Sequence, residues 1–109
     1  MGLVTSSAST NNHNLYFSKD ELAKILNLYS KGVSSGEWKD YAIDFNKNEA
    51  IFFIYKHSWA TPYCVLIKSK EVKKRKIIYG LSLSNTKKSN FSDIDKLIKY
   101  LRRKQLKII

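Results

Sequence analysis

Apolar residues recur with a helical period near the start of the chain. The apolar stripe consists of Leu22, Ile25, Leu26 and Tyr29. Their spacing of i, i+3, i+4 and i+7 predicts an amphipathic helix that packs on a core. Ser18 and Glu21 stand three residues apart at its start, so we expect a capping box there. Gly32 or Gly36 is expected to end the helix, because glycine adopts the left-handed cap without a Cβ clash.

Four later segments have the length and the apolar pattern of β-strands. The predicted strands are residues 41–45, 51–55, 63–68 and 77–84. In the first, Tyr41, Ile43 and Phe45 alternate with small or polar residues, which is typical of a half-buried strand. The second is apolar at every position, which favours a central strand with helices on one side and an aromatic layer or a partner on the other. Short strands joined by short turns predict an antiparallel meander.

A second helix is predicted near the C-terminus, after a polar loop over residues 85–90. Its cap lies between Ser92 and Asp95, and its apolar stripe is Ile94, Leu97, Ile98 and Leu101. The predicted fold is α+β: a four-stranded antiparallel β-meander flanked by an N-terminal and a C-terminal helix (α-β-β-β-β-α), with both helices on one face. Residues 1–14 are small and polar and are expected to form a disordered tail, so one α+β domain spans residues 15–109.

The composition indicates where in the cell the protein is located. Of the 109 residues, 43% are apolar, which is enough for one core. The longest hydrophobic region is interrupted by charged residues and by Pro62, so no membrane span is expected. Cys64 is the only cysteine and allows no internal disulfide, and we see no secretory signal. Together these features predict a cytoplasmic protein.

The net positive charge comes entirely from the last part of the chain. Residues 68–109 carry fourteen Lys or Arg against Glu71, Asp93 and Asp95, which accounts for the whole net charge of +11. Such asymmetry favours an anionic partner, most commonly a nucleic acid. The alternative is codon bias, because Lys, Ile and Asn are abundant while Arg occurs only three times. Both interpretations stay open.

Several cations are candidates for nucleic-acid contact. They are Lys73, Lys74, Arg75, Lys76, Lys87, Lys88, Arg102 and Arg103. Four of them fall in a turn, two in a loop and two near a helix end, and they could converge on one phosphate-binding face. The competing interpretation is a solvated surface without a ligand.

No residue pattern predicts catalysis, a cofactor or a metal. A nucleophilic pair of His57 and Cys64 is conceivable across a hairpin, but Cys64 stands in an apolar strand, where cysteine usually behaves as a small hydrophobe. A metal site needs three or four ligands, and His13 is the only other histidine. Asp44 has no second carboxylate or base near it in the sequence, as catalysis would require.

Six residues are candidates for a protein-interaction surface. They are Trp38, Lys39, Asp40, His57, Trp59 and Tyr63. Trp38 could anchor a contact, or it could pack over the end of the first helix and lock the helix–strand corner, which we favour. Trp59 and Tyr63 could stack on bases, although packing across the hairpin is the more common arrangement.

One stretch carries a family resemblance. The segment Gly36-Glu37-Trp38-Lys39-Asp40-Tyr41-Ala42-Ile43-Asp44-Phe45, preceded by Leu26-Asn27-Leu28-Tyr29, resembles a family of small alphaproteobacterial proteins catalogued only as a domain of unknown function. The resemblance covers roughly residues 15–67 and is poor over the C-terminal third. It implies a bacterial cytoplasmic origin, and it brings no activity, cofactor or catalytic residue with it.

The biochemical function is not fixed by these patterns, and three classes are open. The first is a small non-enzymatic interaction module, which could form a homodimer by pairing an edge strand or by covering the open face of the sheet. The second is an RNA- or DNA-binding protein that uses the basic C-terminal third. The third is an enzyme without a recognisable motif.

Overall fold

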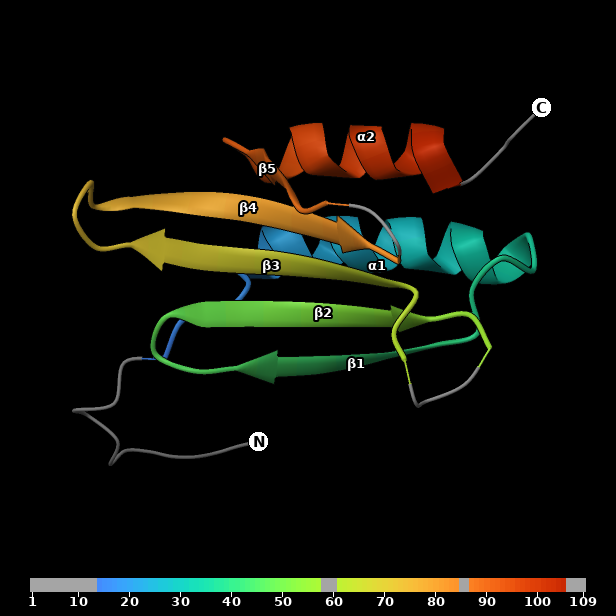
Figure 1. The fold of residues 1–109 in the computed structure, drawn as a ribbon. Coiled ribbons are helices and arrows are strands. Elements are labelled where there is room, and N and C mark those ends of the chain that lie inside the picture. The colour runs from blue at the N-terminus through green and yellow to red at the C-terminus, as the bar shows by residue number, and fades with distance from the viewer. Residues whose placement is uncertain (1–13, 58–60, 85–86, 106–109) are drawn as a thin grey trace.

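The computed structural model describes residues 14–57, 61–84 and 87–105, so residues 1–13 of the predicted N-terminal tail lie outside the described residues. The elements are α1 (Lys19–Ser34), β1 (Asp40–Phe45), β2 (Glu49–Tyr55), β3 (Cys64–Glu71), β4 (Lys76–Leu83), β5 (Ser89–Phe91) and α2 (Ile94–Gln105). All strands pair antiparallel in the order β1-β2-β3-β4-β5. Figure 1 shows this meander with its two helices. The α+β prediction is confirmed.

The predicted number of strands is wrong, because the sheet has five strands and not four. Residues 89 and 90 were expected in the polar loop over residues 85–90, yet residues 89–91 pair with β4, Ser89 opposite Leu81 and Phe91 opposite Tyr79. Three residues with one apolar side chain are too short to show a strand period. The hydrogen-bonding edge of β4, a long-range partner, makes this segment a strand.

Both ends of α1 follow the local rules that the sequence predicts. Ser18 Oγ accepts a hydrogen bond from the Glu21 N–H, and Glu21 Oε1 accepts one from the Ser18 N–H, which completes the capping box. At the other end, the N–H groups of Glu37 and Gly36 donate to the carbonyls of Gly32 and Val33. This is the Schellman pattern, and it places Gly36 in the left-handed region with φ of 80°.

Gly32 has a different role, at the corner between α1 and β1. A Cβ atom at Gly32 would overlap Cε3 of Trp38, so the indole lies flat against the glycine backbone. Trp38 is 1% exposed, and its ring stacks with Tyr29 at 6.3 Å between centroids. The indole therefore packs in the core and fixes the direction in which the chain leaves the helix.

The core lies between the helices and one face of the sheet. From the sheet it contains Phe52, Ile54, Cys64, Leu66, Tyr79 and Leu81, and from the helices Ile25, Leu28, Ile94, Leu97 and Leu101. The strand residues in this set occupy facing register positions, such as Phe52 opposite Leu66 and Leu66 opposite Leu81. Side chains directly opposite in antiparallel strands share a face, so both helices cover the same face of the sheet. Both of the described helices thus lie on one side of β1–β4, and neither lies on the opposite face (Figure 1).

Candidate functional site

The face of the sheet away from the helices, here called the open face, carries a band of apolar side chains. The band consists of Ile51, Phe53, Tyr55, Val65, Ile67 and Ile78. All six are half-buried, because their neighbours in the sheet cover them partly and no helix lies above them. An antiparallel sheet that faces water usually presents polar side chains on that face. A continuous apolar band is therefore the feature of this surface that calls for a function.

Opposite charges border the band on its two sides. Asp40 and Asp44 lie on the open face of β1, and Glu49 begins β2 beside them. On the other side, Lys88 precedes β5 and its side chain lies across Gly80 of β4. A Cβ atom at Gly80 would stand 2.5 Å from Lys88 Cε, so only a glycine leaves room for this lysine to lie on the sheet. The open face thus has an acidic margin and a basic margin.

The free edge of β1 is protected from pairing with another strand. The Asn46 N–H donates to the Glu49 carbonyl, so Asn46 and Glu49 form a hydrogen-bonded pair. Hydrogen-bonded and non-hydrogen-bonded pairs alternate along antiparallel strands, so the backbone N–H and C=O groups of Tyr41, Ile43 and Phe45 point away from β2. Asp40 Oδ1 accepts the Tyr41 N–H and Asp44 Oδ1 accepts the Phe45 N–H, each at 2.8 Å. Two of the three outward N–H groups are therefore already bonded, and both residues that bond them are acidic.

On the helix side of β1, a second apolar surface extends beyond the cover of α1. Tyr41, Ile43 and Phe45 point to this side and are all exposed, Ile43 by 42%. The two aromatic rings of this set pack on other rings: Phe45 on Tyr16 at 4.6 Å, and Tyr41 on Tyr29 at 5.0 Å between centroids. These contacts cover part of the aromatic surface, which comes from β1 alone, whereas the band on the open face comes from three strands.

The structure places most of the residues predicted to form an interaction surface at one end of the sheet. Trp38 lies in the core, whereas Lys39 is exposed and Asp40 lies at the margin of the open face. His57 and Tyr63 lie near the end of β2 and the start of β3, and Trp59 is outside the described residues. The Lys39 N–H donates to the Tyr55 carbonyl and the Tyr63 N–H to the Ile54 carbonyl, so these positions lie near one another, while Trp38 is buried beneath the surface. The sequence predicted a partner on the side of the second strand away from the helices, but it did not identify the residues of the band, because the strand register cannot be read from apolar content alone.

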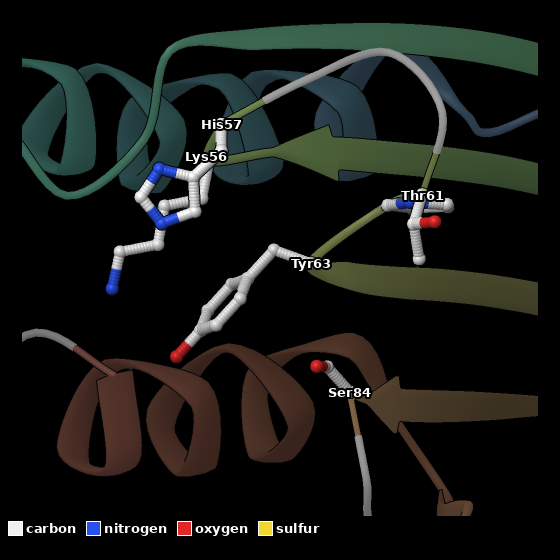
Figure 2. Close-up of a pocket in the computed structure, with 6 residues that line it drawn as sticks. Lys56, His57, Thr61, Tyr63 and Ser84 are labelled. Atoms are coloured by element: carbon white, nitrogen blue, oxygen red, sulfur yellow. The ribbon is translucent and has the colours of Figure 1, made fainter.

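His57 and Tyr63 line a small hollow of about 220 Å³ with Lys56, Thr61, Pro62 and Ser84. Figure 2 shows Lys56 and His57 at the end of β2, and Tyr63 pointing toward α2. Lys56 Nζ lies 4.9 Å from the centre of the Tyr63 ring and 3.6 Å from Glu37 Oε1. The ammonium group is therefore already held by a ring and a carboxylate.

The Cys64 thiol next to this hollow is not set up as a nucleophile. Cys64 is 0% exposed, and burial raises the pKa of its thiol to about 12. A reactive cysteine needs a thiolate that solvent can reach. His57 is exposed and Cys64 is fully buried, so the pair considered from the sequence has no suitable environment. Within the described parts of the chain, no group of three His, Cys, Asp or Glu side chains could hold a metal ion.

A buried ionic network links α1 to the sheet, and sequence reasoning did not find it. Lys68 Nζ donates to Glu21 Oε1 and to the Tyr16 carbonyl, each at 2.8 Å, and the Tyr79 hydroxyl donates to Glu21 Oε2. Burial raises the pKa of Glu21, but hydrogen bonds from Lys68, Tyr79 and the Ser18 N–H outweigh it and lower the pKa below 4.5. Burial and the Glu21 carboxylate raise the pKa of Tyr79. With every polar atom partnered, the network has a structural role.

The cations predicted to bind nucleic acid fall in three separate places. Lys73, Lys74, Arg75 and Lys76 lie in and beside the β3–β4 turn and are all exposed. Lys87 and Lys88 precede β5, while Arg102 and Arg103 are exposed near the end of α2. Figure 1 shows the β3–β4 turn at one end of the sheet, and α2 runs from there toward the other end. The turn and the helix end are therefore at opposite ends of the molecule.

Comparison with known proteins identifies one family. A family model described as "Protein of unknown function (DUF2794)" matches residues 15–89. The match begins where the resemblance in the sequence begins and continues beyond it, through β3 and β4 to the start of β5. No curated protein matches the chain, and no solved structure does. The chemistry of the surface itself is thus the basis for any functional proposal.

Proposed function

The chain belongs to the family described as Protein of unknown function (DUF2794), and we propose that it is a small non-enzymatic protein-interaction module that binds its partner through the open face. We place this activity in the bacterial cytoplasm, which the single buried cysteine supports. Where the chain is described, none of its helices has the length and apolar character needed to cross a membrane.

The observation that carries this proposal is the apolar band on a face without helices. Six half-buried apolar side chains from three adjacent strands lie together there. Contiguous apolar patches of this kind mark contact surfaces in folded proteins, since their exposure to water is unfavourable and promotes association. Two side chains of the band, Phe53 and Tyr55, are aromatic, and aromatic residues are enriched in protein interfaces.

The charge at the margin of the band distinguishes a protein partner from a nucleic acid. Open sheet faces with aromatic residues can bind single-stranded RNA by base stacking. Such surfaces need cations along the path of the phosphates. Here Asp40, Asp44 and Glu49 line one side of the band and would repel phosphates. The open face therefore favours a protein partner.

A site-specific photo-cross-linking experiment tests the proposal. A photoreactive amino acid would replace Phe53 on the open face in the full chain, expressed in bacterial cells. Matched variants would carry it at Ile43 on the helix side of β1, or at Val72 in the β3–β4 turn, which are both exposed. We expect a discrete protein adduct from position 53 and none from the control positions. The absence of an adduct at position 53, or equal adducts at all three, would contradict the proposal.

A second candidate function is nucleic-acid binding by the β3–β4 turn. Four consecutive exposed cations occupy this turn, and Arg75 has a positive φ of 50°, which shapes the turn tightly. The test is fluorescence anisotropy with labelled RNA and DNA at about 50 and 200 mM salt. Binding that salt weakens, and that neutral substitutions at Lys73, Lys74 and Arg75 abolish, would support this function. No binding at the lower salt concentration would exclude it and favour codon bias as the origin of the charge.

A further inference from the structure

We propose that the partner on the open face is a second copy of this chain, bound face to face about a two-fold axis that runs parallel to the strands. This inference rests on the proposed function and names its partner. Its basis is the way in which the two charged margins and the apolar band line up across the sheet.

The register of the sheet puts opposite charges at the two ends of one row. Asp44, Ile51, Ile67 and Gly80 are successive Cα partners across β1, β2, β3 and β4, so their side-chain positions form a line perpendicular to the strands. Lys88 lies over Gly80, at the far end of this line. The row therefore reads acid, isoleucine, isoleucine, lysine from one margin to the other.

A two-fold axis parallel to the strands, placed between β2 and β3, would match this row with itself in reverse. Each Ile51 would then face Ile67 of the second copy, and each Asp44 would face Lys88 of the second copy. In the next row, Phe53 and Val65 are Cα partners and would meet in the same way. A two-fold axis uses one patch twice, so a row with opposite charges at its ends is complementary to itself.

The other face-to-face arrangement is electrostatically unfavourable. A two-fold axis perpendicular to the strands would place β1 of one copy over β1 of the second. Asp40 and Asp44 would then face carboxylates of the same strand, and like charges brought together at an interface cost affinity and specificity. Charge thus selects the axis parallel to the strands.

Edge-to-edge pairing through β1 is also disfavoured. A strand added to β1 would need the N–H groups of Tyr41 and Phe45, which Asp40 and Asp44 already occupy. At the opposite edge, β5 has only three residues and contacts α2. Short or internally bonded edges are a means by which proteins prevent this kind of association.

The size of the band suits a modest dimer. Four strands at about 4.8 Å and seven residues at about 3.3 Å give a footprint of roughly 400 Å² on each copy. Because side chains make the surface uneven, the accessible area buried on the two copies together is larger than twice this footprint, roughly 1,000 Å². This is at the lower end for specific interfaces. Packed sheets cross at about 30°. For four strands about 4.8 Å apart, this rotation shifts the outer strands of one copy by only about 4 Å relative to the strands they face, which a lysine side chain can span. We expect dissociation in the micromolar range.

Sedimentation velocity on the full chain, from about 1 to 300 μM at low salt, tests the inference. We expect the wild-type protein to change from monomer to dimer over this range. Phe53→Lys on the open face should stay monomeric, whereas Ile43→Lys, an equal change on the other face, should dimerise like the wild type. A monomer at every concentration, or a dimer that Phe53→Lys leaves intact, would overturn the inference.

Charge exchange tests the axis without disturbing the core. Asp44 and Lys88 are both exposed, so Asp44→Lys and Lys88→Glu should fold normally. Asp44→Lys frees the Phe45 N–H, but a lysine on an edge strand itself prevents pairing with another strand. Each single change should weaken the dimer about tenfold, because the symmetry alters two contacts at once. The double variant should recover most of the wild-type affinity, as each new lysine faces a new glutamate. Failure of the double variant to recover would overturn the strand-parallel arrangement.

The same reagents separate this inference from the function on which it rests. A cross-link at position 53 between two copies supports both the interaction module and the second copy as its partner. A cross-link at position 53 to a different protein, with a monomer in sedimentation, would overturn the second copy as partner and keep the interaction module. No cross-link at position 53 and no dimer would overturn both.

Discussion

Single residues hold α1 on the sheet through the buried pair of Glu21 and Lys68. Their side chains are 12% and 11% exposed, and the two charged atoms are 2.8 Å apart. Glu21 also completes the capping box of α1, so one carboxylate serves both the helix end and the sheet. Breaking a buried pair leaves an uncompensated charge in the interior, which is far more harmful than the loss of a surface pair.

We therefore predict that Glu21→Gln is strongly destabilising. Glutamine can still serve in a capping box, but it leaves the Lys68 ammonium group buried without a counter-charge. The free energy of unfolding at pH 7 should fall by about 3–5 kcal/mol in denaturant titrations. The matched control is Asp20→Asn, whose side chain is 80% exposed and which should cost less than about 1 kcal/mol. Equal effects of the two changes would contradict the buried-pair account.

The same pair predicts a pH dependence. Because the pKa of Glu21 is lower in the folded state than its ordinary value of 4.5, its contribution to stability is complete above that pH. The contribution is lost as the pH falls from 4.5 through the native pKa, when the carboxylate takes up a proton. Unfolding titrations between pH 7 and pH 3 should show this loss in the wild type. Glu21→Gln should lack it, and a parallel decline in both proteins would refute the assignment to Glu21.

Gly32 gives a prediction in which helix propensity and packing oppose each other. Alanine is favoured over glycine inside a helix by about 1 kcal/mol. At position 32, however, the added methyl group would overlap Trp38, and overpacking a core costs about 1–3 kcal/mol. Gly32→Ala should thus lower the denaturation midpoint, while Ser34→Ala on the exposed side of α1 should leave it nearly unchanged. An increase in stability for Gly32→Ala would show that Trp38 can move aside.

Among the elements, β1 is the longer of the two edge strands of the sheet. Removal of the bond between Asp40 and the Tyr41 N–H should expose that edge. We predict that Asp40→Ala aggregates faster than the wild type on mild heating, as measured by light scattering. Asp40→Asn is the matched control, because it loses the charge but keeps the acceptor oxygen. If the Asn variant aggregates as fast as the Ala variant, charge and not the hydrogen bond protects the edge.

The elements also differ in how well their sequences predict them. Ser18, Glu21 and Gly36 act within a few residues of chain, and their predicted roles at the ends of α1 are confirmed. The four longer strands were predicted with ends that differ by up to three residues from the observed ones. β5 was missed because it is a strand only through its pairing with β4 across the polar loop, and its own three residues show no strand period.

At the scale of the whole molecule, the net charge of +11 acts against folding. Like charges repel more strongly in a compact state, and salt screens them over about 10 Å at 0.1 M. We predict that the melting temperature rises by about 4 °C between 20 and 200 mM sodium chloride at low protein concentration, from roughly 1 kcal/mol of relieved repulsion. Sucrose at matched osmolality is the control. A melting temperature that falls with salt would mean that the favourable ion pairs dominate.

The residues of the apolar band belong to this scale, which explains why the sequence predicted a partner on the open side of the second strand but not the residues that form the band. Apolar residues at 51, 53, 65, 67 and 78 are visible in the sequence, but their common exposure depends on both helices covering the other face. The same holds for the pair of charged margins. Asp44 and Lys88 are 44 positions apart, and only the register of four strands and a glycine at position 80 place them at the ends of one row.

The sequence by itself determined what depends on short-range chemistry: the capped helix, the Schellman end, the α+β class, the antiparallel meander and the family. Each follows from neighbours within a few positions, where backbone geometry and the apolar period act directly. Only the tertiary structure decided the fifth strand, the buried Glu21–Lys68–Tyr79 network and the open face with its opposite margins. These depend on which distant residues meet, and contacts of that kind are set by the packing of the whole core.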